Sequence, residues 1–166
     1  MKLLVFSDSH GSTFTMREAL KRNRGTVDYA IHAGDGADDF ISLAHEFPDV
    51  TFRAVRGNCD YTSPLPPEES FRAEDVDVLV VHGHKFGVKL STGSLLAEAR
   101  RRGAGLVIYG HTHTAREEYV PSWGGFGEVQ LFNPGAAKSG AFGVIEIRGA
   151  QILCSHGNVW NDDDVQ

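Results

Sequence analysis

The sequence has few cysteines and no long apolar run. Its 166 residues include only two cysteines, Cys59 and Cys154, which lie far apart, so a disulfide framework is not expected. No stretch approaches the roughly 18 apolar residues of a membrane span, and the apolar run at residues 3–6 is too short for a signal sequence. We therefore expect a cytoplasmic chain with reduced thiols and no membrane partner.

Basic residues are also in short supply. The 16 Lys and Arg residues are outnumbered by 22 Asp and Glu residues, which gives a formal net charge of −6. Because a duplex-binding surface normally carries a basic footprint, bulk nucleic-acid binding is not expected. A small anionic substrate remains compatible with this charge, since bound cations can supply a local positive field.

What is present is typical of one globular domain. Hydrophobic residues make up 41% of the chain and charged residues 23%, as in an ordinary folded protein. The length suits one full hydrophobic core rather than two. We expect a single domain over residues 1–166, with a solvated acidic tail from about residue 161.

The first part of the chain alternates between strand and helix patterns, which favours βαβ units and a largely parallel sheet. Thr15 and Glu18 have the spacing of a capping box, which predicts a helix that ends near residues 23–25. Further helices are predicted around residues 40–47 and from Ser91 or Thr92 to Gly103. The predicted strands are residues 2–6, 27–33, 51–55, 76–81 and 106–109.

The later part of the chain shows strand patterns joined by Gly-rich turns, and it is predicted to be antiparallel. These predicted strands are residues 116–120, 128–132, 141–147 and 151–155. Residues 62–69 contain three prolines, and no regular structure is predicted for them.

Polar residues able to bind metal follow five of the apolar strands. They are Asp8, His10, Asp35, Asn58, His82, His111 and His113. In open α/β sheets, ligand sites lie at the carboxyl ends of the strands, so these residues are expected to converge. Each fragment alone is weak evidence, but their order and their strand-end positions together form a specific pattern.

This pattern resembles the calcineurin-like metallophosphoesterase superfamily. Its motifs run Asp-x-His, Gly-Asp, Gly-Asn-x-Asp/Glu, His and Gly-His-x-His, and the match spans residues 1 to about 147, including the loop that begins at Asn133. The chain looks like a small prokaryotic phosphodiesterase of this group. The resemblance implies a four-layer αββα sandwich, in which helices flank two mixed β-sheets.

The resemblance also implies two divalent metal ions. One ion would be held by Asp8, His10, Asp35 and His113, and the other by Asp35, Asn58, His82 and His111. Imidazole, carboxylate and amide ligands suit transition metals, with Mn²⁺ expected and Zn²⁺, Fe²⁺, Ni²⁺ or Co²⁺ as alternatives. A metal-bridging hydroxide would then be the nucleophile, and no residue beyond the ligands is predicted to be catalytic.

Cys59 departs from the pattern, because many superfamily members carry a His that is thought to act on the leaving group at this position. A thiol is a poor substitute for a His acid poised near neutral pH. We therefore expect a preference for substrates with good leaving groups, such as aryl phosphodiesters. What protonates the leaving group is left open.

Two further histidines lie close to the motifs. Besides Asn58, His84 is a candidate substrate-binding residue, and an exposed or structural role for it is left open. His32 precedes the Gly-Asp motif within a strand and is predicted to be a core residue with satisfied hydrogen bonds.

Three other functions remain open, of which a nuclease is disfavoured by the acidic charge balance. A eukaryotic retromer subunit has this fold and acts as a scaffold, although several of its ligand positions are altered, whereas all seven are present here. A phosphomonoesterase or protein phosphatase is another alternative, but only Arg56 adjoins a motif as a candidate phosphate ligand. The expected partner is a small phosphate ester, and homo-oligomers are common among related small enzymes.

Overall fold

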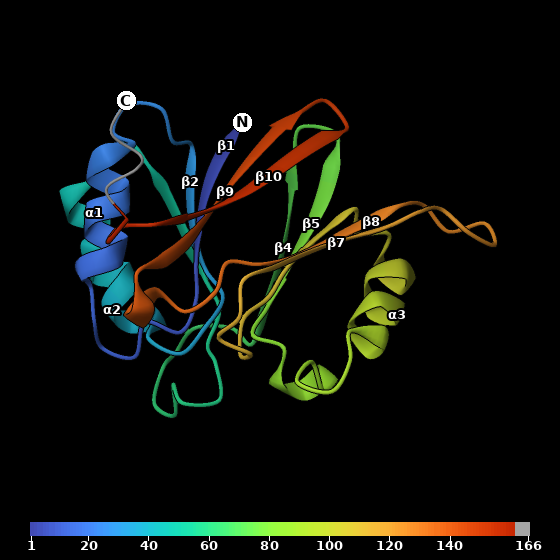
Figure 1. Cartoon of the computed structure of the whole chain (residues 1–166), viewed down its shortest axis with the longest axis horizontal. Helices are drawn as coiled ribbons and strands as arrows, with labels where there is room; N and C mark the ends of the chain where they lie inside the picture. The colour runs from blue at the N-terminus through green and yellow to red at the C-terminus, as the bar shows by residue number, and fades with distance from the viewer. Residues whose placement is uncertain (162–166) are drawn as a thin grey trace.

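The computed structural model describes residues 1–161, which form two five-stranded β-sheets (Figure 1). In spatial order, the strands of sheet A are Gln151–Asn158 (β10), Ala141–Arg148 (β9), Lys2–Phe6 (β1), Tyr29–His32 (β2) and Thr51–Ala54 (β3). Those of sheet B are Glu68–Ala73 (β4), Val76–Val81 (β5), Leu106–Ile108 (β6), Val129–Asn133 (β8) and Arg116–Val120 (β7).

The helices are short. The α-helices of residues 1–161 are Phe14–Arg22 (α1), Ala37–Ser42 (α2) and Gly93–Arg102 (α3). The 3₁₀ helices of the same residues are Leu43–Glu46 (η1), His84–Phe86 (η2) and Ala137–Ser139 (η3). No helix in this part of the chain has the length and apolar character needed to cross a bilayer.

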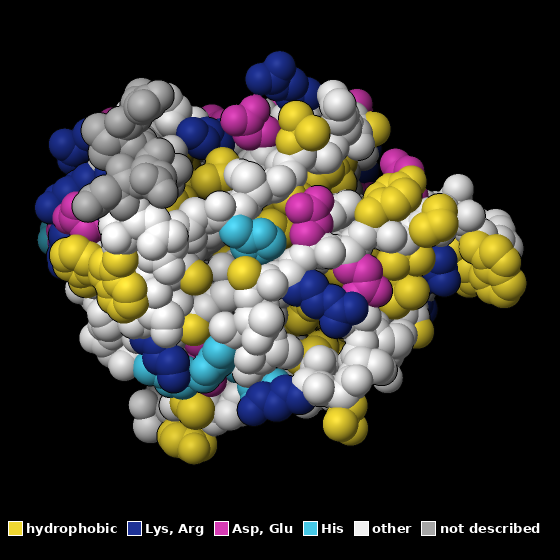
Figure 2. Space-filling model, in the orientation of Figure 1, with side chains coloured by type: hydrophobic (Ala, Val, Ile, Leu, Met, Phe, Trp, Pro, Cys, Tyr) yellow, Lys and Arg dark blue, Asp and Glu magenta, His cyan; other side chains and the backbone are white. Residues whose placement is uncertain are grey.

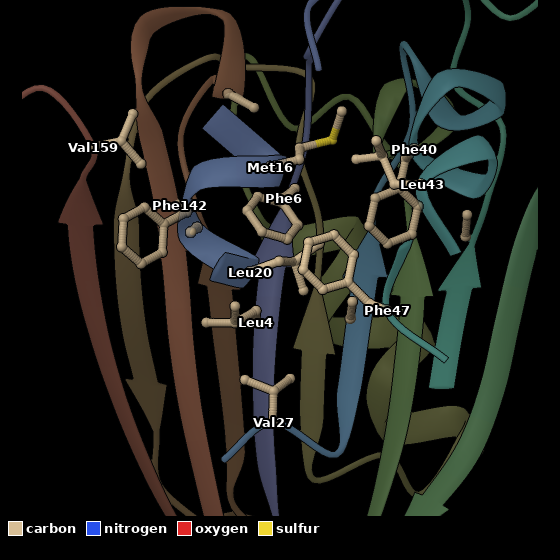
Figure 3. Close-up of a cluster of buried hydrophobic side chains, with 14 of the residues drawn as sticks. Leu4, Phe6, Met16, Leu20, Val27, Phe40, Leu43, Phe47, Phe142 and Val159 are labelled. Atoms are coloured by element: carbon tan, nitrogen blue, oxygen red, sulfur yellow. The ribbon is translucent and has the colours of Figure 1, made fainter. Parts of the chain in front are cut away.

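Three hydrophobic cores separate four layers. The first core lies between sheet A and helices α1 and α2, and it includes Phe6 and Met16 (Figure 3). The second lies between the two sheets, and the third lies between sheet B and α3, where Leu95 and Ala99 are buried. The predicted αββα sandwich of two mixed sheets is therefore confirmed.

Strand β1 shows why the buried strands read as continuous apolar runs. Successive side chains of a strand point to opposite faces of its sheet. Leu4 and Phe6 belong to the core beneath the helices, whereas Leu3 and Val5 belong to the core between the sheets. Both faces of the strand are covered, so neither face needs polar residues.

The sheet topology positions the candidate metal ligands. Strands β1, β2 and β3 are parallel in sheet A, and β5, β6 and β8 are parallel in sheet B. The loops that follow five of these strands, β1, β2, β3, β5 and β6, carry the predicted ligands. Figure 1 shows these loops at one end of the molecule, below the sheets.

Most predicted elements are present, but the capping box is wrong. Thr13 occupies the N-cap position of α1 and makes no side-chain capping hydrogen bond, whereas Thr15 lies inside the helix and is buried. The spacing of Thr15 and Glu18 matched the motif by chance, because the helix begins two residues earlier than the motif requires.

Strand β4 was not predicted. It pairs in an antiparallel manner with β5, from Glu68 opposite Val81 to Ala73 opposite Val76. It is an edge strand on which exposed and partly buried residues alternate, so its hydrophobic signal is weak. The loop predicted to reach residue 69 therefore ends before Glu68.

The prediction that the later part of the chain is antiparallel is only partly right. β7 pairs with β8, and β9 pairs with both β1 and β10, all in antiparallel ladders. However, β8 also pairs with β6 in parallel, with Leu106 opposite Gln130. A local turn pattern does not reveal which distant strand will be the second neighbour. The predicted acidic tail lies mostly at residues 162–166, outside the described residues.

Candidate metal centre

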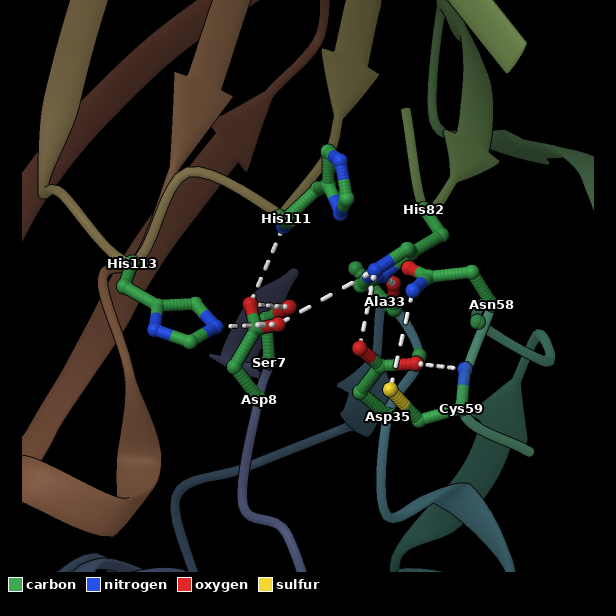
Figure 4. Close-up of polar contacts among 12 residues, drawn as sticks. Ser7, Asp8, Ala33, Asp35, Asn58, Cys59, His82, His111 and His113 are labelled. Carbon is green, nitrogen blue, oxygen red and sulfur yellow. Dashed lines mark hydrogen bonds and ion pairs between the residues drawn. The ribbon is translucent and has the colours of Figure 1, made fainter. Parts of the chain in front are cut away.

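The strand-end loops bring six of the seven predicted ligands into two groups. Asp8, His10 and His113 form the first group, and Asp35, His82 and His111 form the second. Within each group the potential ligand atoms all lie within 4.8 Å of one another. Figure 4 shows most of these side chains converging from separate loops.

The two groups adjoin each other. His10 Nε2 of the first group lies 3.9 Å from Asp35 Oδ2 of the second. His82 Nε2 of the second group lies 3.9 Å from Asp8 Oδ1 of the first. The two groups are therefore close enough to hold two neighbouring cations.

Asp8 is fully buried, and only one of its two carboxylate oxygens is satisfied. Oδ2 accepts hydrogen bonds from Ser7 Oγ at 2.5 Å and from the backbone N–H of His111 at 3.0 Å. Oδ1 has no hydrogen-bond donor among the described residues, yet it lies 3.2 Å from His113 Nε2. A buried, unsatisfied anionic oxygen is costly unless a cation binds it.

His82 is the counterpart of Asp8 in the second group. Its Nδ1 lies 2.7 Å from the carbonyl oxygen of Ala33 and can only donate to it, which leaves the lone pair of a neutral ring on Nε2. Nε2 is buried without a hydrogen-bond partner in residues 1–161 and lies 3.3 Å from Asp35 Oδ2. A carbonyl that fixes the tautomer in this way is a usual partner of a metal-binding His.

Asp35 belongs to the second group and also faces His10 of the first. Its Oδ1 accepts the backbone N–H of Cys59 at 2.8 Å, whereas Oδ2 is the oxygen nearest to both His82 and His10. Burial would raise the pKa of Asp35, but the His82 imidazole and the Cys59 N–H outweigh it and hold the pKa below its usual range. The carboxylate is therefore ionised at neutral pH and suits a bridging position.

Asp60 ties the loops after β2 and β3 together. Its carboxylate accepts the backbone N–H groups of Asp35, Gly36 and Gly57, each at 2.8 Å. The sequence motif includes this residue, but the sequence did not reveal its role. Its position indicates a support for the loop of Asp35 rather than a metal ligand.

The backbone of the site is strained. Among residues 1–161, six non-glycine residues have positive φ, and five of them are predicted ligands. Those five are Asp8, His10, Asp35, His111 and His113, with φ between 46° and 70°. Left-handed conformations of this kind are unfavourable for residues with a Cβ and cluster at functional sites.

Two glycines allow the loops to approach the carboxylates. A Cβ on Gly57 would lie 2.1 Å from Asp35 Oδ1, and a Cβ on Gly110 would lie 2.8 Å from Asp8 Oδ2. No other residue fits at these positions without displacing a carboxylate. The close approach explains the Gly before Asn58 and the Gly before His111.

The two candidate substrate-binding residues lie beside the second group. Asn58 is exposed, and its Nδ2 donates to Cys59 Sγ at 3.6 Å (Figure 4). The ring of His84 lies 5.5 Å from that of His82 and 6.1 Å from that of His111, between centroids. Nδ1 of His84 is buried with no hydrogen-bond partner in residues 1–161. Substrate binding by either residue stays a prediction, as does the ligand role of Asn58.

His32 is a core histidine, as predicted, and it supports the loops of the site through two hydrogen bonds. It is fully buried, its Nδ1 accepts the N–H of Gly34 at 3.0 Å, and its Nε2 lies 2.9 Å from Ser9 Oγ. Burial lowers the pKa of His32 to about 3, so the ring is neutral. It holds the loops after β1 and β2 in register.

Asn133 supports the loop between His111 and His113. Its Nδ2 donates to the Gly110 carbonyl and to Thr112 Oγ1, both at 3.0 Å, and its Oδ1 accepts the N–H of Gly135 at 3.0 Å. The loop that begins at Asn133 therefore lies next to the site, as the resemblance implied.

The arrangement of the strands and ligand loops agrees with a comparison of the whole sequence. Residues 1–150 match the calcineurin-like phosphoesterase superfamily domain. The chain belongs to this superfamily. It is 31% identical over 138 residues to a probable metallophosphoesterase, YsnB, of Bacillus subtilis, a match that covers 83% of this chain and 76% of YsnB.

Solved structures share the calcineurin-like fold. A predicted phosphoesterase from Streptococcus pneumoniae superposes with a TM-score of 0.78 at 23% identity, over 95% of this chain and 88% of that one. An archaeal phosphodiesterase gives 0.67 at 23% identity, over 94% and 99%. Vps29 of Entamoeba histolytica complexed with Zn²⁺ gives 0.73 at 18% identity, over 95% and 99%.

Proposed function

We propose that this member of the calcineurin-like superfamily hydrolyses phosphodiesters at a dinuclear metal centre. The observation that carries the proposal is the pair of adjoining ligand groups with Asp35 between them and two unsatisfied buried atoms, Asp8 Oδ1 and His82 Nε2, facing the same space. Asp8, His10, Asp35 and His113 would hold one ion, and Asp35, Asn58, His82 and His111 the other. When bound, two such ions activate water as a nucleophile and offset the charge of the phosphoryl oxygens.

The protonation states of Asp35 and His111 suit divalent cations. The Asp35 carboxylate is ionised, and burial together with the neighbouring His82 and Lys89 lowers the pKa of His111, so that its ring is neutral at pH 7. Neutral imidazoles and ionised carboxylates are the forms that bind metal. This mixed nitrogen and oxygen set favours a transition metal, and we propose Mn²⁺.

Two lysines belong to segments that contact the ligand groups. Lys89 is one of the charges that lower the pKa of His111, and the backbone N–H of Lys138 donates to the Asp8 carbonyl at 3.3 Å. Neither lysine forms an ion pair within residues 1–161, although the whole chain carries a net charge of −6. Figure 2 shows Lys or Arg side chains next to the histidines on this part of the surface. Positive side chains on this part of the surface are compatible with an anionic ester.

Cys59 supports a preference for diesters with good leaving groups. Its Sγ lies within 4.8 Å of the ligand atoms of His10 and Asp35. Burial and the nearby Asp35 carboxylate raise the pKa of the thiol, which makes it a still weaker proton donor. A leaving group that departs as a stable anion does not need a donor, so aryl diesters should react faster than alkyl diesters.

The test is an assay of protein stripped of metal and reconstituted with Mn²⁺, Zn²⁺ or Co²⁺. Bis(p-nitrophenyl) phosphate, p-nitrophenyl phosphate and an alkyl diester would be compared by kcat/KM. We expect turnover that depends on metal, with the aryl diester fastest. Faster hydrolysis of the monoester would overturn the choice of substrate class, and equal rates for aryl and alkyl diesters would overturn the argument from Cys59.

A scaffold function is the second candidate, and the structural similarity to Vps29 is what favours it. The Vps29 structure with Zn²⁺ means that metal content alone does not separate the two functions. Turnover does separate them, because a scaffold could bind metal without hydrolysing any ester. All seven ligand positions are present in this chain, which favours the enzyme.

A further inference from the structure

Tyr61 stands at the edge of the metal centre and is almost fully exposed. Its side chain is 89% exposed, more than any other large aromatic residue in residues 1–161. It follows Cys59 by two residues, and the sulfur of Cys59 lies within 4.8 Å of the His10 and Asp35 ligand atoms. Because consecutive Cα atoms are about 3.8 Å apart, the Cα atoms of Cys59 and Tyr61 are at most about 7.6 Å apart.

The loop that carries Tyr61 is fixed on both sides of the residue. Before it, the Asp60 carboxylate accepts three backbone N–H groups, and the Asp60 N–H donates to the Gly57 carbonyl at 3.3 Å. After it, the Ser63 N–H donates to the Asp60 carbonyl at 3.2 Å, and Ser63 Oγ donates to Asp38 at 2.8 Å. The backbone position of Tyr61 is therefore defined before any ligand binds.

Nothing in residues 1–161 uses the ring of Tyr61. It takes part in none of the aromatic or cation–π pairs of these residues, and its hydroxyl makes no hydrogen bond within them. Tyr29, by contrast, stacks on Phe71 and lies beneath Arg53, and Tyr119 donates to Glu128. An exposed aromatic face without a partner, on an anchored loop beside the ligand groups, is suited to stacking on a planar group of the substrate.

We propose that Tyr61 is a specificity-determining residue that stacks on an aromatic ring carried by one ester arm of the substrate. The preferred substrate class would then be phosphodiesters with a nucleobase or aryl group, a proposal that rests on the proposed function. In the reaction, a water oxygen forms a bond to phosphorus and the bond to the leaving oxygen breaks. The leaving alcohol takes up a proton, and the other arm stays on the monoester product.

Three diesters would show whether Tyr61 recognises the ring, and on which arm. Methyl hexafluoroisopropyl phosphate carries no aromatic group. Thymidine 5′-(hexafluoroisopropyl phosphate) carries one on the retained arm, and methyl 4-chlorophenyl phosphate carries one on a leaving arm of similar acidity. We expect Tyr61→Ala to lower kcat/KM about fivefold to tenfold for at least one aromatic diester and to leave the first diester unchanged.

Two variants provide controls. Tyr61→Phe keeps the aromatic face and should retain the activity towards aromatic diesters. Trp123 is 72% exposed at the tip of the β7–β8 hairpin, which Figure 1 shows extending on the α3 side, away from the ligand loops. Trp123→Ala removes an exposed aromatic ring elsewhere and should change none of the three rates.

Calorimetry adds a readout other than activity. The metal-loaded protein should bind thymidine 5′-monophosphate more tightly than methyl phosphate, and Tyr61→Ala should remove about fivefold to tenfold of that difference. An equal loss for all three diesters, or no loss for either aromatic diester together with unchanged binding, would overturn the role of Tyr61. If no diester is hydrolysed at all, the proposed function fails, and the calorimetric comparison still tests the stacking.

Discussion

The two sheets make different contributions to the predicted metal centre. The loops after sheet A strands carry every predicted oxygen ligand, from Asp8, Asp35 and Asn58, together with the imidazole of His10. The loops after sheet B strands supply imidazoles only, from His82, His111 and His113. Neither sheet alone completes a ligand group, since Asp8 meets His113 and Asp35 meets His82 and His111. The centre therefore depends on the packing of the core between the sheets.

Burial divides the ligands in a second way. The side chains of Asp8, Asp35 and His82 are at most 3% exposed, whereas those of His10 and His113 are 30% and 38% exposed. Backbone hydrogen bonds hold the three buried ligands, and the two exposed imidazoles face the solvent side. The comparison suggests that the buried ligands define the geometry of the centre and that the exposed ligands border the space open to substrate.

The largest effect should come from the carboxylate that lies between the two groups. Asp35→Asn keeps the size of the side chain but removes the charge next to both His10 and His82. We expect loss of at least one ion and a fall in kcat/KM of about a thousandfold or more, measured by elemental analysis and aryl diester hydrolysis. Asp77→Asn, at the one exposed position of β5, is the matched control. Two retained ions with unchanged turnover would rule out the proposed mechanism.

A buried and an exposed imidazole from sheet B should respond differently to replacement. His82→Asn removes the buried Nε2 atom, although the shorter amide can still donate to the Ala33 carbonyl. Solvent cannot easily replace a ligand atom at so buried a place, so added metal should not restore activity. His113→Asn changes an exposed ligand, and we expect a loss of about tenfold to a hundredfold that millimolar metal partly restores. Titration of both variants with Mn²⁺ gives the comparison. If Mn²⁺ restored the activity of both variants equally, burial would not determine how much each ligand contributes to metal binding.

Removal of the metal should lower the stability of the fold, because the predicted ligands come from both sheets. A ligand present at 100 times its Kd stabilises the folded state by about 2.7 kcal/mol, so chelation should lower Tm by about 5–10 °C for a chain of this size. Thermal unfolding with and without a chelator measures the shift. Asp35→Asn protein should show little of it, and a full shift in that variant would mean that the metal binds elsewhere.

The last effect concerns stability rather than activity, and it depends on His32 of sheet A, which underlies the loops of the site. Its pKa is about 3 in the folded chain because of burial, against about 6.5 when unfolded. Between these values the unfolded chain holds the extra proton, so stability falls as the pH drops from 6.5 towards 3, by at most about 1.4 kcal/mol per pH unit.

His32→Asn keeps an acceptor for the Gly34 N–H and should flatten this dependence between pH 6 and pH 4. Denaturant unfolding of metal-free wild-type and variant proteins at several pH values measures the slope. Parallel curves for the two proteins would mean that His32 takes up its proton in the folded state as readily as in the unfolded state.

Much of this site could be predicted from the sequence, because ligands after parallel strands share one edge of a sheet. The pattern named Asp8, Asp35 and His82 alongside His10 and His113, but it did not rank them, since burial depends on how the second sheet covers the first. The support from Asp60 was not predicted either, because its carboxylate accepts N–H groups from a loop that follows a different strand.

The same limit applies to the fold. The continuous apolar runs of β1 and β5 predicted those strands well, because each strand is covered on both faces. Strand β4 and the parallel pairing of β8 with β6 were missed, since an edge strand has a weak pattern and a strand does not encode its neighbour locally. The exposed ring of Tyr61 had no pattern to mark it, and only its anchored position beside the ligands suggests a use.

The positive φ angles of five predicted ligands also affect which substitutions a deep mutational scan of this chain would enrich. At Asp8, His10, Asp35, His111 and His113, selection for abundance alone should favour Gly and Asn over Ala, Val or Ile, since these two residues tolerate the left-handed region best. Selection for turnover should instead retain the wild-type residue. The two selections would therefore diverge at these five positions for a reason of backbone conformation, a reason that does not apply at His82.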